Sequence, residues 1–270
     1  MKICFIGGGN MASAIIGGLL ESNYVQAATV RVVEINADNR ARLQSQFGVQ
    51  VTADLAEGAA DSEVVVLAVK PQQLRELTGQ LAPMLNGQLI ISIAAGIRAA
   101  DLQRWLDTRN IVRAMPNTPA LIRQGVTGLY ALRGVCAGHK TIAGKILDAV
   151  GSSVWLDDEA QMDALTAVSG SGPAYVFYFI EAMQQAAQEL GLDAGQAQQL
   201  VLGTFAGATA LAQASDEDVG TLRARVTSKN GTTERALLSM EADQVKQSII
   251  KAAQAAAARS KEMGDELGGA

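Results

Sequence analysis

Two short segments carry the small and hydroxyl-bearing residues that bind anions, and the first lies near the N-terminus. The apolar run at residues 2–6 has the length of a strand and leads into Gly7-Gly8-Gly9-Asn10-Met11, after which apolar residues recur at helical spacing. Strand, glycine turn and helix in this order are the context of a dinucleotide-binding fingerprint. We expect Gly7 to permit the tight turn, Gly9 to let the backbone approach a pyrophosphate, and small Ala12 to let the helix pack close to the strand. A purely structural turn is the alternative.

The second segment, residues 226–234, reads Val-Thr-Ser-Lys-Asn-Gly-Thr-Thr-Glu. It precedes a helix expected to begin near its end, so several backbone N–H groups and hydroxyls would be exposed together as an anion nest. A small carboxylate substrate could dock there. Helix capping by Thr232 or Thr233 is the alternative, but capping leaves Ser228 and Gly231 unexplained.

An acidic residue closes the second predicted strand. The β-branched run at residues 29–33 ends at Glu34, about 20 residues past the glycines, where dinucleotide-binding folds hold the ribose hydroxyls. Such a carboxylate favours NAD over NADP because it would repel a 2′-phosphate. Asn36, Asn39 and Arg40 follow directly and could receive that phosphate instead, so both cofactors stay open. An ordinary solvated strand end is the alternative interpretation of Glu34.

Three further predicted strands end in small, amide or basic residues. The strands are the runs at residues 63–69, 89–93 and 110–115. They are followed by Lys70-Pro71, by Ala94-Ala95-Gly96 and by Asn117, whose loop is stiffened by a proline on either side. Open α/β sheets bind ligands at the carboxyl ends of their strands, so these ends are expected to form the wall of a nicotinamide site. Plain connecting loops are the alternative.

Residues 1–159 alternate between strand and helix patterns, and residues 160–270 are helical. Continuous apolar strand runs are typical of a parallel sheet covered on both faces. The sequence therefore predicts an α/β fold, with a doubly wound dinucleotide-binding domain at 1–159 and an all-helical domain at 160–270. The acidic run Asp157-Asp158-Glu159 marks the boundary. The last helix is expected over residues 243–263, and Gly268-Gly269-Ala270 are expected to fray.

The helical half lacks the charged stripe of ordinary surface helices. Between Lys145 and Arg223 there is no Lys or Arg, while Ala, Leu, Val, Phe and Gly dominate. Helices that are apolar nearly all round must be buried on most sides, which a domain of about 110 residues cannot achieve alone. We therefore predict that these helices pack against a second copy of the chain. Gly191 is expected to end one helix and Asp193 to cap the next.

Composition and charge narrow the possible functions. The formal net charge is -5 and no block of Lys or Arg occurs, so a nucleic-acid footprint is not evident. Cys4 and Cys136 give neither a disulfide framework nor the spacing of metal ligands. The one histidine, His139, leaves His-ligated zinc and Ser-His-Asp hydrolysis without enough parts, and we expect no metal. Without a leader or an apolar run of about 18 residues, a cytoplasmic protein that crosses no membrane is expected.

Six segments in order resemble the pyrroline-5-carboxylate reductase family, and the resemblance covers essentially the whole chain. They are residues 5–11, 68–71, 92–96, 115–119, 168–175 and 226–233. The resemblance implies an N-terminal Rossmann domain and an all-α dimerisation domain that interleaves with its partner in a homodimer, often within larger rings. It also implies the last step of proline biosynthesis, in which NADPH or NADH reduces the cyclic imine 1-pyrroline-5-carboxylate to L-proline.

Carried over position by position, the resemblance assigns a role to each predicted site residue. The pyrophosphate would be held by Ile6, Gly7, Gly8, Gly9, Asn10 and Met11, and the adenosine ribose by Glu34 and Asn36. The nicotinamide half would be lined by Ala68, Val69, Lys70, Pro71, Ala94, Ala95, Gly96 and Asn117. The substrate carboxylate would be bound by Ser228, Asn230, Gly231, Thr232 and Thr233.

In such a reductase, hydride passes to C5 of the imine, so the cofactor's C4 must lie about 3–3.5 Å from that carbon. Thr233 is the candidate catalytic residue because its hydroxyl could hydrogen-bond the imine nitrogen, and a bound water is the alternative proton donor. Many family members carry Pro-Gly where this chain has Lys229-Asn230. Asn230 is expected to preserve the loop because asparagine tolerates a left-handed conformation.

Two other classes of function share parts of this pattern. A hydroxyacid dehydrogenase of the same domain plan would need a catalytic Lys or similar group at the start of the helical domain, and residues 168–175 offer none. A regulator that binds NAD(P) without catalysis is compatible with the first domain but gives no reason for the second anion-binding segment. The reductase is therefore the preferred hypothesis.

Overall fold

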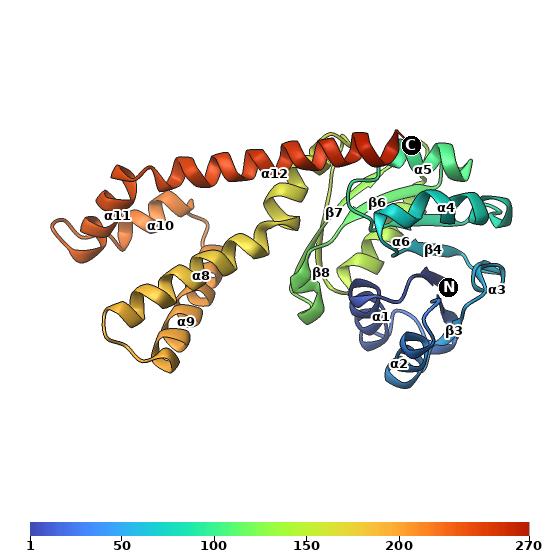
Figure 1. The fold of residues 1–270 in the computed structure, drawn as a ribbon, viewed down its shortest axis with the longest axis horizontal. Coiled ribbons are helices and arrows are strands. Elements are labelled where there is room, and N and C mark those ends of the chain that lie inside the picture. Colours follow the sequence, from blue (N-terminus) through green and yellow to red (C-terminus); the bar gives the residue numbers. More distant parts are fainter. Residues whose placement is uncertain (270) are drawn as a thin grey trace. The chain divides into compact units, whose positions relative to one another are not determined.

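The computed structural model describes residues 1–269, which form two compact units (Figure 1). Unit 1 consists of Met1–Ser171 and the C-terminal stretch that begins at Ala255, and unit 2 consists of Gly172–Gln254. Ala270, part of the predicted helical domain and of the expected frayed end, lies outside the described residues. Within residues 1–269, every helix is too short or too polar to span a membrane.

Unit 1 is built on one eight-stranded sheet. Its strands are β1 (Ile3–Ile6), β2 (Val30–Val33), β3 (Gln50–Thr52), β4 (Val64–Leu67), β5 (Leu89–Ser92), β6 (Ile111–Met115), β7 (Gly125–Ala131) and β8 (Gly151–Trp155). Their order is β3-β2-β1-β4-β5-β6-β7-β8, and all neighbours pair in parallel except β6 and β7. Because the first six strands have the order of a doubly wound dinucleotide-binding sheet, the predicted Rossmann-type fold is confirmed.

Most helices of unit 1 connect these strands. They are α1 (Asn10–Glu21), α2 (Ala37–Phe47), α3 (Leu55–Ala59), α4 (Pro71–Leu81), α5 (Ala99–Leu106) and α6 (Ala137–Asp148), and α7 (Gln161–Leu165) follows the last strand. Shorter helical turns are η1 (Ala27–Thr29), η2 (Ala82–Met84), η3 (Thr118–Ile122) and the π-helical η4 (Thr166–Gly170). Pro71 occupies the first turn of α4, as predicted, since proline lacks the N–H that a first turn cannot use.

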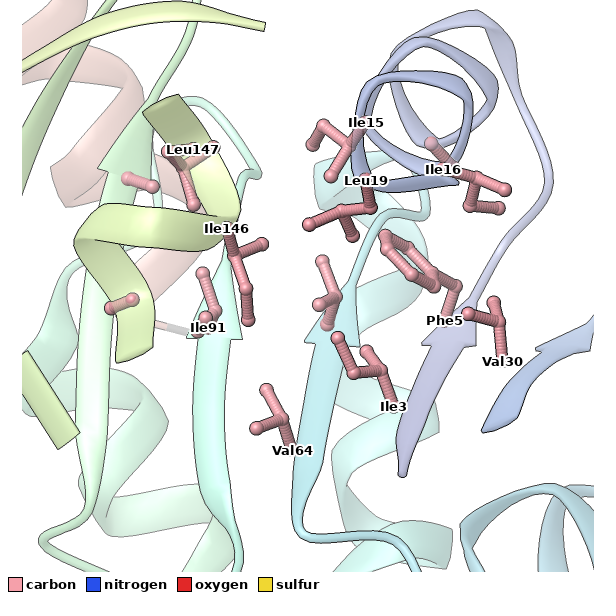
Figure 2. Packing of buried hydrophobic residues seen from close by; sticks show 14 of the residues in the cluster. Ile3, Phe5, Ile15, Ile16, Leu19, Val30, Val64, Ile91, Ile146 and Leu147 are labelled. Carbon is pink, nitrogen blue, oxygen red and sulfur yellow. The ribbon is translucent and has the colours of Figure 1, made fainter. Parts of the chain in front are cut away.

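Two hydrophobic cores cover the two faces of the sheet, because successive residues of a strand point to opposite sides. Figure 2 shows the first core, in which Ile3 and Phe5 of β1 meet the face of α1 that carries Ile15 and Leu19. Ile146 of α6 belongs to the same core. All five side chains are almost completely excluded from solvent, so this core fixes α1, and with it the glycine turn, against β1.

The second core lies under α4 and α5. Cys4 and Ile6, the alternate residues of β1, pack there with Leu74 of α4 and Trp105 of α5. Burial raises the pKa of the Cys4 thiol to about 12, so this thiol stays protonated and unreactive at neutral pH. With both faces of the sheet covered, the predicted reason for its continuous apolar strands is confirmed.

The end of α12 (Val245–Gly268) is attached to unit 1 by polar contacts. Arg98 forms an ion pair with Asp265 at 2.6 Å, and Arg104 donates to the carbonyl of Gly268 at 2.6 Å. The hydroxyl of Ser260 donates to Asp163 at 2.7 Å. Gly268 is buried and helical, so the expectation that it frays is wrong: its carbonyl has a charged donor in Arg104.

The boundary between the two structural units lies further along the chain than the predicted boundary between residues 159 and 160. Leu165 of α7 packs over Gly128 of β7, and Gly170 lies against Met115 at the end of β6. These contacts hold the first helical residues of the second half to the sheet. The division by packing therefore falls after Ser171, and the end of α12 returns to the first unit.

Unit 2 consists of helices. They are α8 (Gly172–Glu189), α9 (Ala194–Gln213), α10 (Val219–Arg225), α11 (Thr232–Ala242) and the first part of α12. Gly191 follows α8 with a φ of +98°, and Asp193 caps α9 in a reciprocal capping box with Gln196, so both predictions are confirmed. Large apolar side chains on α8 remain exposed, with Phe177 at 65% and Tyr178 at 71%. Such a surface indicates a protein partner.

Candidate active site

The glycine turn has the strand–turn–helix geometry that the sequence predicts. Gly7 has a φ of +100°, and a Cβ at this position would lie 2.6 Å from the carbonyl oxygen of Ala68. Only glycine fits this combination of a left-handed backbone and close approach. The Gly7 N–H donates to the Val33 carbonyl at 2.8 Å, which ties the turn to the end of β2. Ala12 is buried in the core, as expected for close packing of α1 on the strand.

Gly9 stands at the N-cap of α1 and leaves the helix end open. Within residues 1–269, no side chain caps this end and a Cβ on Gly9 would have no atom within 4 Å. Asn10 and Met11 are the first residues of α1, so their N–H groups belong to the turn that no helical carbonyl satisfies. Open space beside free N–H groups and the positive end of the helix dipole is suited to a phosphate.

A cavity of about 550 Å³ lies beside this turn. The predicted residues that line it are Ile6, Gly7, Gly8, Gly9, Glu34, Asn36, Ala68, Val69 and Lys70. The predicted residues outside its lining are Asn10, Met11, Pro71, Ala94, Ala95, Gly96 and Asn117. The structure thus brings together the ends of β1, β2 and β4, which is the edge where doubly wound sheets bind nucleotides.

Glu34 is hydrogen-bonded to the backbone of two other residues that line this cavity. One carboxylate oxygen accepts from the Gly8 N–H at 3.0 Å, and the other accepts from the Asn36 N–H at 2.9 Å. Asn36 in turn caps α2 by accepting from the Asn39 N–H at 2.9 Å. Arg40 does not line the cavity, but it donates to the Glu34 carbonyl at 2.7 Å, so a basic group lies next to the acidic one. Both cofactor alternatives therefore have a side chain in place.

The small residues that follow β5 pack against the C-terminal helix. Gly96 has a φ of +74°, and a Cβ there would lie 3.2 Å from Met263 and 3.3 Å from Leu267 of α12. Ala94 is buried in the second core. Packing of α12 therefore accounts for the size of Gly96, and the predicted nicotinamide contact of residues 94–96 stays a prediction.

The amide of Asn117 is already hydrogen-bonded within unit 1. Its oxygen accepts from the Val126 N–H at 2.9 Å, and its nitrogen donates to the carbonyl of Ser169 at 3.2 Å and to the Ser169 hydroxyl at 3.3 Å. These bonds fix the amide at the end of β6, and the predicted nicotinamide contact of Asn117 stays a prediction. Asn117 ties the end of β6 to β7 and to the π-helical turn, which gives the Ser-Gly sequence around Ser169 a structural role.

The second anion-binding segment belongs to unit 2 and folds as a turn before α11. Asn230 has a φ of +61°, which confirms the left-handed conformation expected of it, and the Gly231 N–H donates to the Ser228 carbonyl at 3.0 Å. Helix α11 begins at Thr232 with Gly231 at the N-cap, and no side chain caps it. The alternative of capping by Thr232 or Thr233 is therefore wrong, and the hydroxyls and first-turn N–H groups stay available to an anion.

A second backbone donor of this turn is also not available. The Asn230 N–H donates to the carboxylate of Glu234 at 2.6 Å. Asn230 can therefore contribute to a substrate site through its side chain but not through its N–H. The donors that remain for an anion are the N–H groups of Thr232 and Thr233 and the side-chain hydroxyls, of which Ser228 supplies one.

Several residues that line the cavity were not predicted from the sequence as site residues. They are Val33, Ile35, Ala53, Leu55, Gln73, Glu76, Leu77 and Gln80. A signal for the α4 members exists, because Gln73, Leu77 and Gln80 recur at the three- and four-residue spacing of one helix face. Leu55 lies between Asp54 and Glu57, which have the spacing of a helix-capping pair, and the Asp54 side chain accepts from the Glu57 N–H at 3.0 Å. This spacing is a signal that a helix begins at Leu55.

Two family models match the chain. The one described as "Pyrroline-5-carboxylate reductase dimerisation" matches residues 159–263, and the one described as "NADP oxidoreductase coenzyme F420-dependent" matches residues 2–96. The first match assigns the helical half to a dimerisation domain, in agreement with its exposed apolar helices. The second covers β1 to β5, which include the glycine turn.

Relatives and solved structures extend the match over the whole chain. The pyrroline-5-carboxylate reductase of Pseudomonas aeruginosa is 49% identical over 99% of this chain and 98% of its own length. The structure of a pyrroline-5-carboxylate reductase from Coxiella burnetii has a TM-score of 0.92 at 40% identity, over 97% of this chain and 98% of that one. The Plasmodium falciparum pyrroline carboxylate reductase, solved with NADP bound, has a TM-score of 0.88 at 30% identity, over 98% of both chains. The chain therefore belongs to the pyrroline-5-carboxylate reductase family.

Proposed function

We propose that the chain reduces 1-pyrroline-5-carboxylate to L-proline with hydride from NADPH or NADH. Its membership of the reductase family carries this proposal, together with the open glycine turn at the nucleotide-binding edge of a doubly wound sheet. When bound, the reduced nicotinamide supplies the hydride. The protein's own contribution is to hold both reactants in a productive geometry and to control the proton.

The pyrophosphate of the cofactor would lie on the glycine turn. The free N–H groups at the start of α1 would donate to its oxygens, beside the space left open at Gly9. The residues proposed to contact the rest of the cofactor are Glu34 and Asn36 at the ribose and Ala68, Val69, Lys70, Pro71, Ala94, Ala95, Gly96 and Asn117 towards the nicotinamide. Support is strongest for the members of this set that line the cavity.

The substrate carboxylate would bind the turn before α11. The N–H groups of Thr232 and Thr233 and the hydroxyl of Ser228 are the proposed donors, with Asn230 and Gly231 shaping the turn. The Thr233 hydroxyl would hydrogen-bond the imine nitrogen and hold it in line for hydride transfer to C5. Because a hydroxyl is a weak acid, Thr233 would orient the nitrogen while a bound water delivers the proton.

The choice between the two nicotinamide cofactors would be made by Glu34 and the neighbouring Arg40. The carboxylate favours the ribose diol of NADH, and the guanidinium, which already donates to the Glu34 and Ile35 carbonyls, favours the 2′-phosphate of NADPH. The NADP bound by the Plasmodium falciparum relative shows that NADP fits a structure of this family. We therefore keep both cofactors in the proposal.

The functional unit would be a homodimer, and rings of such dimers are the larger assembly that the family resemblance implies. The helical half matches a dimerisation domain, and Phe177, Tyr178, Leu200 and Leu211 are all exposed by more than half in the single chain. Packing against a second copy would remove this apolar surface from water. The reaction would take place in the cytoplasm, where reduced nicotinamide is available.

Spectrophotometry tests the function directly. Absorbance of NADPH or NADH should fall when 1-pyrroline-5-carboxylate is added, and it should not fall with hydroxyacids or keto acids. Oxidation driven by a keto acid instead would assign the chain to the hydroxyacid dehydrogenases. Binding of cofactor without turnover of any of these compounds would favour the non-catalytic regulator.

A further inference from the structure

Side chains from the second βα unit hold the middle glycine of the turn by both of its backbone polar groups. Glu34 accepts from the Gly8 N–H at 3.0 Å, and Nη2 of Arg42 on α2 donates to the Gly8 carbonyl at 3.0 Å. Leu43 occupies the third side, since a Cβ on Gly8 would lie 2.5 Å from its Cδ1. Gly8 is therefore fixed from β2 and α2 although it belongs to a loop.

The bond from Arg42 determines where the next N–H points. In a trans peptide the carbonyl of one residue and the N–H of the following one point in opposite directions across the same plane, and none of the described peptide bonds is cis. With the Gly8 carbonyl held towards α2, the Gly9 N–H points away from α2. No described residue accepts a hydrogen bond from it, and a Cβ on Gly9 would meet only open space.

The N–H groups of Gly7 and Gly8 are both hydrogen-bonded within the protein. The Gly8 N–H is taken by Glu34, so it is withdrawn from any anion, and the Gly7 N–H is taken by Val33. Gly9 is therefore the first residue along the turn whose N–H can reach a phosphate. The direction of that single donor depends on the peptide plane that Arg42 holds.

The guanidinium of Arg42 is itself held in place. Its Nη2 also donates to the Ser13 hydroxyl at 3.3 Å, and its Nη1 donates to Gln46 at 3.2 Å. Arg42 is not among the residues that line the cavity. Arg42 therefore contacts the glycine turn on the side away from the cavity.

We propose that Arg42 is a positioning residue for the cofactor pyrophosphate, which acts by orienting the Gly8–Gly9 peptide so that the Gly9 N–H donates to a phosphate oxygen. Glu34 assists by holding the other side of Gly8. This inference rests on the proposed function only in that the cavity holds a nicotinamide dinucleotide. It is independent of which imine or carbonyl compound is reduced.

The test compares Arg42→Met with wild type and with Gln46→Ala. Arg42→Met removes the donors and keeps the aliphatic stem, while Gln46→Ala removes a partner of Arg42 and leaves the bond to Gly8. Calorimetric titration of the full chain with NADP⁺ and with NAD⁺ should show both dissociation constants raised about 10- to 100-fold in Arg42→Met, the range of a lost hydrogen bond to a charged group. Gln46→Ala should bind both as wild type does.

The dependence of affinity on salt separates positioning from direct attraction. Between about 0.15 M and 1 M salt the Debye length falls from about 8 to about 3 Å. Over this range a guanidinium that pairs with the phosphate adds to the salt dependence of binding, whereas the charge of one that orients a peptide behind the site is screened. We expect the same salt slope in wild type and Arg42→Met. A shallower slope in the variant, or unchanged affinity, overturns the proposal.

Arg42→Lys is the conservative rescue, and Arg42→Ala keeps the test decisive should Arg42→Met not fold. Lysine retains one donor for the Gly8 carbonyl, so its affinity is expected to lie between those of wild type and a variant without donors. Equal affinity in Arg42→Ala and Gln46→Ala overturns the proposal. Wild type that binds both nucleotides but reduces no imine would refute the proposed reaction alone, and wild type that binds neither would refute both.

Discussion

Replacing Gly9 by valine tests the proposed cofactor site without disturbing the fold. In the ligand-free chain a Cβ at Gly9 meets no atom within 4 Å, and its φ of -70° is accessible to any residue. The added side chain would instead fill the space through which a pyrophosphate approaches the backbone. Gly7→Ala is the matched contrast, because its Cβ would lie 2.6 Å from a backbone oxygen at a φ of +100°.

The two substitutions should therefore differ in what they damage. Gly9→Val changes an N-cap residue, which costs about 1 kcal/mol or less and lowers the melting temperature by at most about 2–4 °C. If it prevents one charge-assisted hydrogen bond to the phosphate, worth about 1.5–3 kcal/mol, the dissociation constant for the cofactor rises about 10- to 100-fold. Gly7→Ala should lose about 1–3 kcal/mol of stability from its strained backbone alone.

Thermal unfolding of the ligand-free variants and titration with NADP⁺ and NAD⁺ measure the two effects separately. We expect Gly9→Val to melt close to wild type and to bind both nucleotides weakly, and its KM for the cofactor to rise. Unchanged affinity in Gly9→Val would refute the assignment of the pyrophosphate to this turn. Loss of stability as large as that of Gly7→Ala would show that the space beside Gly9 is not free.

Three further outcomes are expected. Thr233→Ala should lower kcat/KM for the imine by about 1–3 kcal/mol in barrier, with Thr233→Ser restoring most of it, and wild-type kinetics would exclude a role for the hydroxyl. Glu34→Ser should shift the ratio of kcat/KM towards NADPH, since the ratio cancels effects on the shared pyrophosphate, and a ratio that does not move would contradict the role of the carboxylate. A thiol reagent should label exposed Cys136 in the folded chain and Cys4 only after unfolding, because burial raises the pKa of Cys4 to about 12. Because the Cys4 pKa is higher in the folded chain than its unfolded value of 9, the protonated thiol contributes to stability below pH 9. This contribution to the free energy of unfolding is lost as pH rises from 9 to 12, and alkaline unfolding would measure the loss.

Much of the fold could be predicted because its signals are local. Apolar runs such as the one that forms β4 indicate strands buried on both faces, and Pro71 and Asp193 mark helix starts by chemistry that needs no tertiary partner. Helix α3 was missed because its five residues have no period to detect. The helical conformation of Gly268 was not predicted because the donor to its carbonyl, Arg104, lies far away in the sequence.

In the candidate site, too, residues with local signals could be predicted and residues with partners distant in sequence could not. Gly7 could be predicted because a left-handed turn after a strand requires glycine, and its φ bears this out. Gly96 and Asn117 have equally suggestive residue types, but their contacts go to Met263 and Ser169, which no local pattern indicates. Arg42 carries no signal in a single sequence, since its partner is a backbone carbonyl in another loop.

A crystal structure with NADP⁺ and a proline analogue would show whether the two anion-binding segments meet at one reaction centre. We expect the pyrophosphate at the N–H of Gly9 and the carboxylate of the analogue on the N–H groups of Thr232 and Thr233. The nicotinamide C4 should lie about 3–3.5 Å from the ring carbon that accepts hydride, within one subunit or across a pair. A carboxylate bound elsewhere, or a turn before α11 that lies far from every nicotinamide, would contradict this expectation.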